Sequence, residues 1–187
     1  SSLVPSKEKQ VSKLITIQEG CDKFCSFCVV PYTRGAEFSR PLEDIYAEAN
    51  SLVKNGAREI TLLGQNVSAY KSDILEDGKK VNVKLGFLCE TLSRINGLER
   101  IRYLTSHPID IDDLLIDQHR NNSKLMPFLH LPIQSGSDKV LKKMNRKHDK
   151  KFYLDLINKI KKKNKNMAFS SDFIIGHPGE TDYDFQE

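Results

Sequence analysis

The sequence predicts an α/β fold in which parallel strands alternate with helices. Apolar segments of strand length alternate with amphipathic segments of helix length, giving about five βα units, and such alternation is typical of parallel strands joined by right-handed crossovers. The strand segments are near-continuous apolar runs, as expected where both faces of a sheet are buried. Several of them end in polar or glycine-rich segments, and ligand sites of such folds lie at the carboxyl ends of the strands.

The individual elements follow from the spacing of apolar residues. The first strand, "KLITIQEG" (13–20), ends at Gly20. The first helix, over 40–56, has apolar residues at helical spacing, with Pro41 suited to its first turn and Gly56 placed to cap its end. The same reasoning predicts strands over 58–64, 100–105, 126–134 and 167–180 (the last with its loop), and helices over 85–97, 110–121, 138–146 and 149–164.

Composition places the 187 residues among ordinary globular proteins, with 39% hydrophobic residues, 29% charged residues and a net charge of +4. No apolar run approaches the roughly 20 residues of a membrane span, and no secretory signal opens the chain. We therefore expect a cytoplasmic protein without a membrane partner. The length fits one domain. Because the chain lacks an initiator methionine and stops where a helix begins, we expect both ends to be cut from a longer protein.

Three cysteines stand close together in "EGCDKFCSFCVVPYTRG" (19–35), at Cys21, Cys25 and Cys28. In a reducing compartment such a cluster is more often a metal site than a disulfide framework. Structural zinc sites usually come as two ligand pairs, and ferredoxin spacings require a fourth cysteine. Three thiolates directly after the first strand would instead leave one iron of a 4Fe-4S cluster open, although a structural zinc site remains an alternative. Cys89 lies on an apolar helical face and is expected in the core.

These residues carry a resemblance to a known family. Cys21-x-x-x-Cys25-x-Phe27-Cys28 resembles the signature of the radical S-adenosylmethionine (SAM) superfamily. The strings "EGCDKFCSFCVVPYTRGAEFSRP", "LLGQNVSAY", "TSHP", "HLPIQSGSD" and "SSDFIIGHPGET" are similar to tRNA methylthiotransferases of the MiaB type. The resemblance implies a partial (βα)6 TIM-like barrel, a 4Fe-4S cluster on three cysteines and S-adenosylmethionine bound to the open iron. It also implies that residues 13–187 are the core domain, truncated before its last strand.

The family's reaction inserts a methylthio group at carbon 2 of isopentenyladenosine, next to the anticodon of tRNA. The resemblance implies a second 4Fe-4S cluster in a missing amino-terminal domain, joined through a linker over 1–12. It also implies an electron-transfer protein as reductant, and we expect a monomer. The chain alone is therefore not expected to methylthiolate. Three alternatives stand beside this interpretation. One sister branch modifies an aspartate of a ribosomal protein, another modifies threonylcarbamoyladenosine in tRNA, and the third alternative is a non-catalytic RNA-binding module with a structural metal.

Loops at the strand ends supply candidate cofactor-binding residues. A glycine lets the backbone approach a ligand, and side-chain amides can hydrogen-bond an amino or carboxylate group, although helix-capping turns are the alternative. The resemblance implies that the loop after the second strand meets the methionine amine, that after the fourth the ribose, and the end of the fifth the adenine. An aromatic ring in the cysteine loop is expected beside cluster or adenine, or in the core. The candidates are Phe27, Gly64, Gln65, Asn66, Gln134, Ser135, Gly136, Ile175 and Gly176.

Basic residues raise the question of RNA contact. Arg34 and Arg40 are candidates for contact with RNA phosphate or bound cofactor, with structural salt bridges as the alternative. Residues 139–165 hold twelve lysines and arginines against two aspartates, a balance that suits RNA binding. Because outer helices of such folds are normally solvated, we favour a solvated face here. His177 stands where relatives more usually carry an aromatic residue, and no role is assigned to it.

Overall fold

The computed structural model describes residues 10–187, so the linker expected over 1–12 falls mostly outside the described residues. Its central sheet is parallel, in the order β1-β4-β7, formed by Ser12–Thr16, Glu59–Leu63 and Arg100–Tyr103. The register places Ser12 opposite Glu59 and Glu59 opposite Arg100. The predicted parallel order of the first three strands is therefore confirmed.

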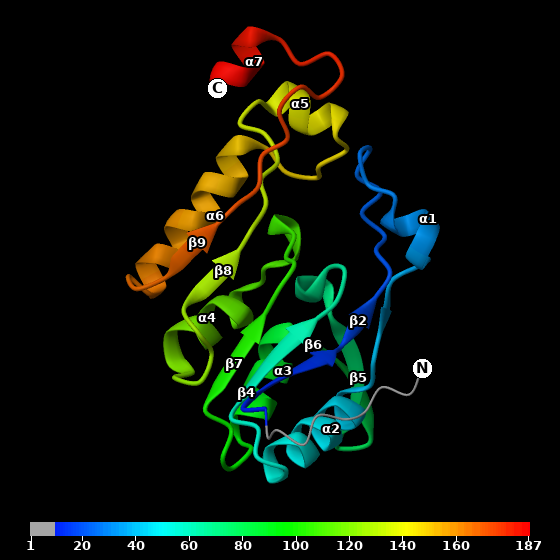
Figure 1. Ribbon diagram of the computed structural model, residues 1–187, viewed down its shortest axis with the longest axis vertical. Coiled ribbons are helices and arrows are strands. Elements are labelled where there is room, and N and C mark those ends of the chain that lie inside the picture. The colour runs from blue at the N-terminus through cyan, green and yellow to red at the C-terminus, as the bar shows by residue number, and fades with distance from the viewer. Residues whose placement is uncertain (1–9) are drawn as a thin grey trace.

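The remaining two strands continue the sheet less regularly. β8 (Phe128–His130) pairs in parallel with β9 (Ala168–Ser170), and a single parallel bridge between Ile101 and Leu125 links them to β7. Within residues 10–187, β1 has only β4 beside it and β9 has only β8. The α/β class is confirmed, but the structure shows an open parallel sheet where the resemblance implied a partial barrel, because no strand hydrogen bonds join the two edges (Figure 1).

Amphipathic helices cover the outer face of the sheet. Alternate strand residues such as Ile15, Leu62 and Ile101 are almost fully buried in one apolar core with these helices, as the strand periodicity requires. Asp112 and Asp149 cap two of the helices, accepting hydrogen bonds from backbone N–H groups at 2.9 and 2.7 Å. The covering helices are α2 (Leu42–Lys54), α3 (Leu85–Ser93), α4 (Asp113–Asn121) and α6 (Lys150–Lys163). Two short helices, α5 (Asp138–Lys143) and α7 (Asp182–Gln186), lie beyond the ends of the strands (Figure 1), and the 3-10 turns are η1 (Val67–Ala69) and η2 (Pro108–Asp110).

Several elements differ from the sequence-based expectations. The predicted strand 13–20 is divided into β1 and β2 (Gln18–Glu19), and β2 pairs antiparallel with β3 (Phe38–Ser39). A short helix, α1 (Val30–Arg34), follows the cysteines. A hairpin of β5 (Lys71–Glu76) and β6 (Lys79–Lys84) precedes α3. Its turn residues Asp77 and Gly78 both have positive φ, 49° and 75°, as a type I′ turn requires.

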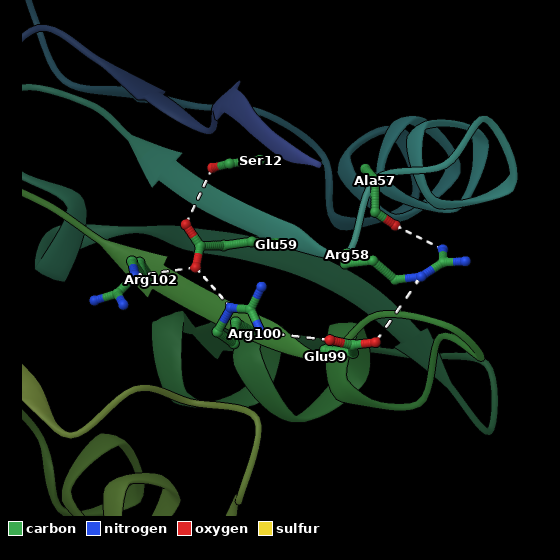
Figure 2. A network of polar contacts seen from close by, with 7 residues as sticks. All are labelled: Ser12, Ala57, Arg58, Glu59, Glu99, Arg100 and Arg102. Carbon is green, nitrogen blue, oxygen red and sulfur yellow. Dashed lines mark hydrogen bonds and ion pairs between the residues drawn. The ribbon is translucent and has the colours of Figure 1, made fainter. Parts of the chain in front are cut away.

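A polar network ties the three central strands together on the face away from the helices. Glu59 accepts hydrogen bonds from Ser12 at 3.0 Å, from Arg100 at 2.9 Å and from Arg102 at 3.3 Å (Figure 2). Burial alone would raise the pKa of Glu59, but these hydrogen bonds hold it below its ordinary value. The charge is therefore balanced inside the protein. No helix in the described part of the chain is long and apolar enough to cross a bilayer.

Candidate functional site

The three predicted cysteine ligands lie in the loop between β2 and α1 and line one cavity of about 250 Å³ at the carboxyl ends of the strands. Cys25 is buried, while Cys21 and Cys28 are half-buried. Burial raises the pKa of the Cys21 thiol. No group of three or more Cys, His, Asp or Glu side chains within residues 10–187 is arranged to hold a single metal ion. The predicted residues that share the cavity with the cysteines are Phe27, Gln65, Asn66 and Gln134.

One buried side chain joins the start of the cysteine loop to the loop after β4. Gln18 is fully buried, and its Oε1 accepts hydrogen bonds from the backbone N–H groups of Gln65 and Asn66, both at 2.9 Å. Its Nε2 donates to the carbonyl of Gly20 at 2.6 Å, while the Gly20 N–H donates to Gln65 Oε1 at 2.7 Å. A Cβ on Gly64 would lie 2.6 Å from Gln18 Oε1. Gly64 thus permits the close approach of Gln18, and it does not itself line the cavity.

A second set of contacts supports the cysteine loop from the opposite side. The Ser26 N–H donates to the carbonyl of Met144 at 3.0 Å, and the Asn145 amide donates to the carbonyl of Phe24 at 2.7 Å. Asn145 has a φ of 56°, a left-handed conformation that asparagine tolerates better than most residues. The Ser26 hydroxyl also lies 3.4 Å from Nε2 of His177, so His177 is placed beside the cysteine loop.

Charged and titratable groups surround the cavity. Lys23, between two cysteines, forms an ion pair with Asp110 at 2.8 Å, and Asp110 also accepts from the Asn66 amide at 2.8 Å. Arg146 Nη1 lies 3.5 Å from the sulfur of Cys25. Burial, followed by the nearby charge of Arg146, lowers the pKa of His107 to about 2. His107 is therefore neutral at physiological pH and adds no charge to the cavity.

Asn66 is less available to a ligand than the sequence suggested. Its side chain is buried, its Nδ2 donates to Asp110 and its Oδ1 accepts from the Ser68 hydroxyl at 2.8 Å. The Ser68 hydroxyl in turn accepts from the His107 N–H at 2.9 Å. Asn66 is thus fixed by protein partners and holds the loops after β4 and β7 together.

The other predicted residues lie outside this cavity. Ser135, Gly136 and Ile175 line a neighbouring cavity of about 350 Å³ between the loop after β8 and α7. Gln134 lines the first cavity and directly precedes Ser135 of the second. Its N–H donates to the Asp172 carbonyl at 3.0 Å, and its carbonyl accepts from the Ile174 N–H at 2.9 Å. Gly176 follows Ile175 with a φ of 79°. The predicted cofactor-binding residues therefore lie partly at one cavity and partly at the other, while Gly64 and Gly176 line neither.

Neither candidate arginine lines the cysteine cavity. Arg40 donates to the carbonyl of Thr16 and to the Glu48 carboxylate, each at 2.7 Å, which is the salt bridge foreseen as its alternative role. Arg34 is exposed at the end of α1. Part of the positive charge of the basic helix α6 is likewise paired within the protein, since Lys163 forms an ion pair with Asp117 of α4 at 2.9 Å.

Sequence reasoning missed a set of polar residues at the cavity. The string "TSHP" could have identified Thr105, Ser106 and His107, because polar residues at the end of the third strand were expected to face ligands. For Gln18 and Arg146 no local signal exists: one stands in a strand segment and the other among many basic residues. The missed residues are Gln18, Lys23, Thr105, Ser106, His107, His130, Arg146 and Asp172.

The donor set fits an iron-sulfur cluster together with the methionine end of S-adenosylmethionine. Three thiols can each bind iron as thiolates. Arg146 Nε is buried and has no hydrogen-bond partner in the described residues, so a donor remains for an anionic group. The amide of Gln65 reaches the same cavity wall.

The fold and this cysteine cavity place the protein in a known class. The family model described as "Radical SAM superfamily" matches residues 15–187, and the chain belongs to this superfamily. Among solved structures, the radical S-adenosylmethionine methyltransferase TsrM from Kitasatospora setae aligns with a TM-score of 0.68 at 16% identity, over 92% of this chain and 32% of its own. The cobalamin-dependent radical enzyme OxsB aligns with a TM-score of 0.66 at 13% identity, over 87% and 23%. These two likenesses concern the fold alone.

More similar sequences share one name. The chain is 58% identical over 178 residues to the tRNA-2-methylthio-N(6)-dimethylallyladenosine synthase of Neorickettsia sennetsu, covering 95% of this chain and 37% of that protein. It is 57% identical to the protein of that name from Rickettsia felis, over 94% and 39%, and 56% identical to that from Bartonella tribocorum, over 97% and 39%. The chain therefore spans about two fifths of the length of these relatives.

Proposed function

We propose that Cys21, Cys25 and Cys28 hold a 4Fe-4S cluster with one open iron, and that S-adenosylmethionine binds this iron from the cysteine cavity. The observation that carries the proposal is the cavity itself, where three thiols from one loop face side-chain amides from two strand ends. Membership of the radical SAM superfamily implies both groups for this chain. When bound, they supply one-electron chemistry that removes a hydrogen atom from the substrate.

The residues of the two cavities are proposed to orient S-adenosylmethionine. The Gln65 amide is assigned to the methionine amino group and Gln134 to the ribose, with Phe27 packing beside them. Ser135, Gly136, Ile175 and Gly176 are assigned to the adenosine end, because the second cavity opens from the loop that also holds Gln134. Asn66 is assigned a positioning role through Asp110 and Ser68.

We further propose that the chain is the radical SAM core, residues 13–187, of a tRNA-2-methylthio-N(6)-dimethylallyladenosine synthase. On this proposal it acts on a tRNA anticodon stem-loop, receives electrons from a reducing electron-transfer protein and works beside a second 4Fe-4S cluster outside residues 13–187. The support is the 55–58% identity to relatives of that name along nearly the whole chain.

The cluster is tested by anaerobic reconstitution of the chain with iron and sulfide, followed by EPR of the reduced protein with and without S-adenosylmethionine. We expect a reduced 4Fe-4S signal that shifts when S-adenosylmethionine is added. Cys25→Ala should lose the signal, whereas Cys89→Ala, in the apolar core, serves as the matched control and should retain it. Zinc without acid-labile sulfide would contradict the proposal and favour a structural metal site.

The substrate is tested by exchange between relatives. Residues 10–187 replace the matching segment of the Neorickettsia sennetsu protein, and tRNA is analysed by mass spectrometry for the methylthio group on isopentenyladenosine. We expect the modified base to form with the exchanged protein, and not when Cys25→Ala is included. A protein that holds both clusters but leaves this base unmodified would contradict the substrate assignment while leaving the cluster proposal intact.

A further inference from the structure

We propose that Arg146 is a positioning residue for the buried ligand Cys25, and that its guanidinium raises the reduction potential of the cluster by donating a hydrogen bond to the Cys25 sulfur. The inference rests on the proposed cluster and adds a residue that controls it. Arg146 stands in the connection between α5 and α6, 121 positions along the chain from Cys25. The contact is therefore a product of the tertiary fold.

The guanidinium is held in place at two points. Nη1 donates to the Cys25 sulfur at 3.5 Å, and Nη2 donates to the carbonyl of Pro132 at 2.8 Å. Pro132 lies in the segment after β8 and lines the same cavity. Because the guanidinium is planar with donors in a fixed fork, anchoring one nitrogen on Pro132 fixes the direction in which the other points at the sulfur.

The backbone beside Arg146 is fixed to the cysteine loop as well. The two preceding residues, Met144 and Asn145, make the hydrogen bonds to Ser26 and Phe24 at 3.0 and 2.7 Å. These contacts are made on either side of Cys25 in the sequence. Three consecutive residues of one turn therefore contact three consecutive residues of the cysteine loop, and the sulfur and the guanidinium keep a defined separation.

Arg146 is also a cation without a counterion. Within residues 10–187 it forms no ion pair, whereas the other cation at the cavity, Lys23, is paired with Asp110 at 2.8 Å. The histidines facing it do not supply or remove charge near neutral pH: burial first, and Arg146 itself, lower the pKa of both His107 and His148. The Cys25 sulfur, 3.5 Å from Nη1, would as a thiolate carry negative charge in direct contact with the guanidinium, and so would the cluster that it would hold.

This arrangement has a direct electrostatic consequence. Reduction adds one negative charge to the cluster, and hydrogen bonds to cluster sulfurs together with nearby positive charge favour the reduced form. Cys25 is the buried cysteine of the three, with 9% of its surface exposed, and charge interactions are screened least where water is excluded. Arg146 therefore makes the cluster easier to reduce, which is the step that precedes radical formation in the proposed reaction.

The test measures the midpoint potential of the reconstituted chain without S-adenosylmethionine, by EPR-monitored redox titration. Arg146→Gln removes the charge but keeps a side-chain amide, whereas Arg146→Lys keeps the charge without the planar fork of donors. Arg94→Gln controls for the loss of a remote charge, because Arg94 pairs with Glu90 on the surface of α3. We expect Arg146→Gln to lower the equilibrium constant for reduction roughly tenfold, equivalent to 59 mV for one electron. Arg146→Lys should lie between it and the wild type, and Arg94→Gln should equal the wild type.

Iron content, sulfide content and thermal melting are measured on the same samples, so that a purely structural effect of the substitution can be told apart from an effect on the reduction potential. A titration in which Arg146→Gln holds a full cluster at the wild-type potential overturns the inference, even if its affinity for S-adenosylmethionine falls, because the residue would then serve the cofactor only. An equal shift in Arg94→Gln overturns it too. Should Arg146→Gln fail to hold a cluster, the Arg146→Lys titration decides: a wild-type potential there overturns the inference. A wild-type chain that takes up no cluster overturns the proposed function itself.

Discussion

Replacing Gln18 by methionine should weaken both the fold and the cysteine cavity. The substitution keeps the length and approximate volume of the side chain but removes its acceptor and its donor. The N–H groups of Gln65 and Asn66 then lose their acceptor, and the Gly20 carbonyl loses the hydrogen bond donated by the Gln18 side chain. Gln18 is fully buried, so water does not reach these groups without local opening.

The magnitude follows from the number of groups left unpaired. A buried donor without a partner costs about 1–3 kcal/mol, and two such N–H groups give about 2–6 kcal/mol. The methionine side chain gains some free energy from the burial of apolar surface in place of an amide, and the loop can relax in part. We therefore expect the free energy of unfolding to fall by about 3 kcal/mol, which is a large share of the roughly 5–15 kcal/mol typical of a domain.

The assay is equilibrium urea unfolding of the chain without metal, followed by circular dichroism. With a slope of about 1–3 kcal/mol per molar urea, the midpoint should fall by about 1–3 M. Gln186→Met, at an exposed position of α7, is the control and should unfold with the wild type. A loss below about 1 kcal/mol in Gln18→Met, or an equal loss in the control, would refute the reasoning that Gln18 joins the two loops.

Three further outcomes are expected. Gly86→Ala should cost about 1–3 kcal/mol in urea unfolding, because the new Cβ would lie 2.8 Å from the backbone nitrogen of Leu115 where α3 meets α4. Burial lowers the pKa of His119 from 6.5 to about 4, so this side chain is neutral in the folded protein near neutral pH. Its contribution to the free energy of unfolding is complete above pH 6.5 and is lost as the pH falls toward 4. The free energy of unfolding should therefore fall by about 2 kcal/mol between pH 7.5 and 5, and this fall should be absent in His119→Gln. Arg40→Gln, half-exposed and paired with Glu48, should cost at most about 1 kcal/mol and leave iron content and the EPR response to S-adenosylmethionine unchanged; loss of that response would instead assign Arg40 to the cofactor.

The regular elements were predictable where burial repeats locally along the chain. α2 illustrates this: its apolar spacing and its flanking Pro41 and Gly56 gave bounds within two residues of Leu42–Lys54. The hairpin of β5 and β6 was missed although Asp77-Gly78 is a turn signal for hairpins. The strands around it are largely exposed, with Leu75 74% exposed, so their sequence lacks the continuous apolar run that identified the central strands.

The site was predictable only in its strand-end residues. The cysteines, Gln65 and Gln134 lie in loops that follow strands. Parallel strands bring their carboxyl ends to one edge, so a shared cavity could be expected. Gln18 and Arg146 are different, because their importance lies in contacts with residues 47–48 and 121 positions away. Composition and periodicity do not indicate which distant residues these two side chains contact, since a buried glutamine and a loop arginine have many possible partners.

Long-range contacts also fix the cysteine loop at the open side of the sheet. The edge strands β1 and β9 share no hydrogen bonds in the described part of the chain, yet the cysteine loop that follows β2 contacts Met144 and Asn145 after α5 and His177 after β9. The loop thus contacts the far part of the fold across the side that strand pairing leaves open, and Figure 1 shows the tip of the blue loop beside the yellow turn near α5. Contacts made by a loop are easier to open than strand ladders, because they involve few buried groups. On the proposed function, a bound cluster that prefers this arrangement of the loop would stabilise these contacts through binding linkage, and it would add a connection that strand pairing does not make.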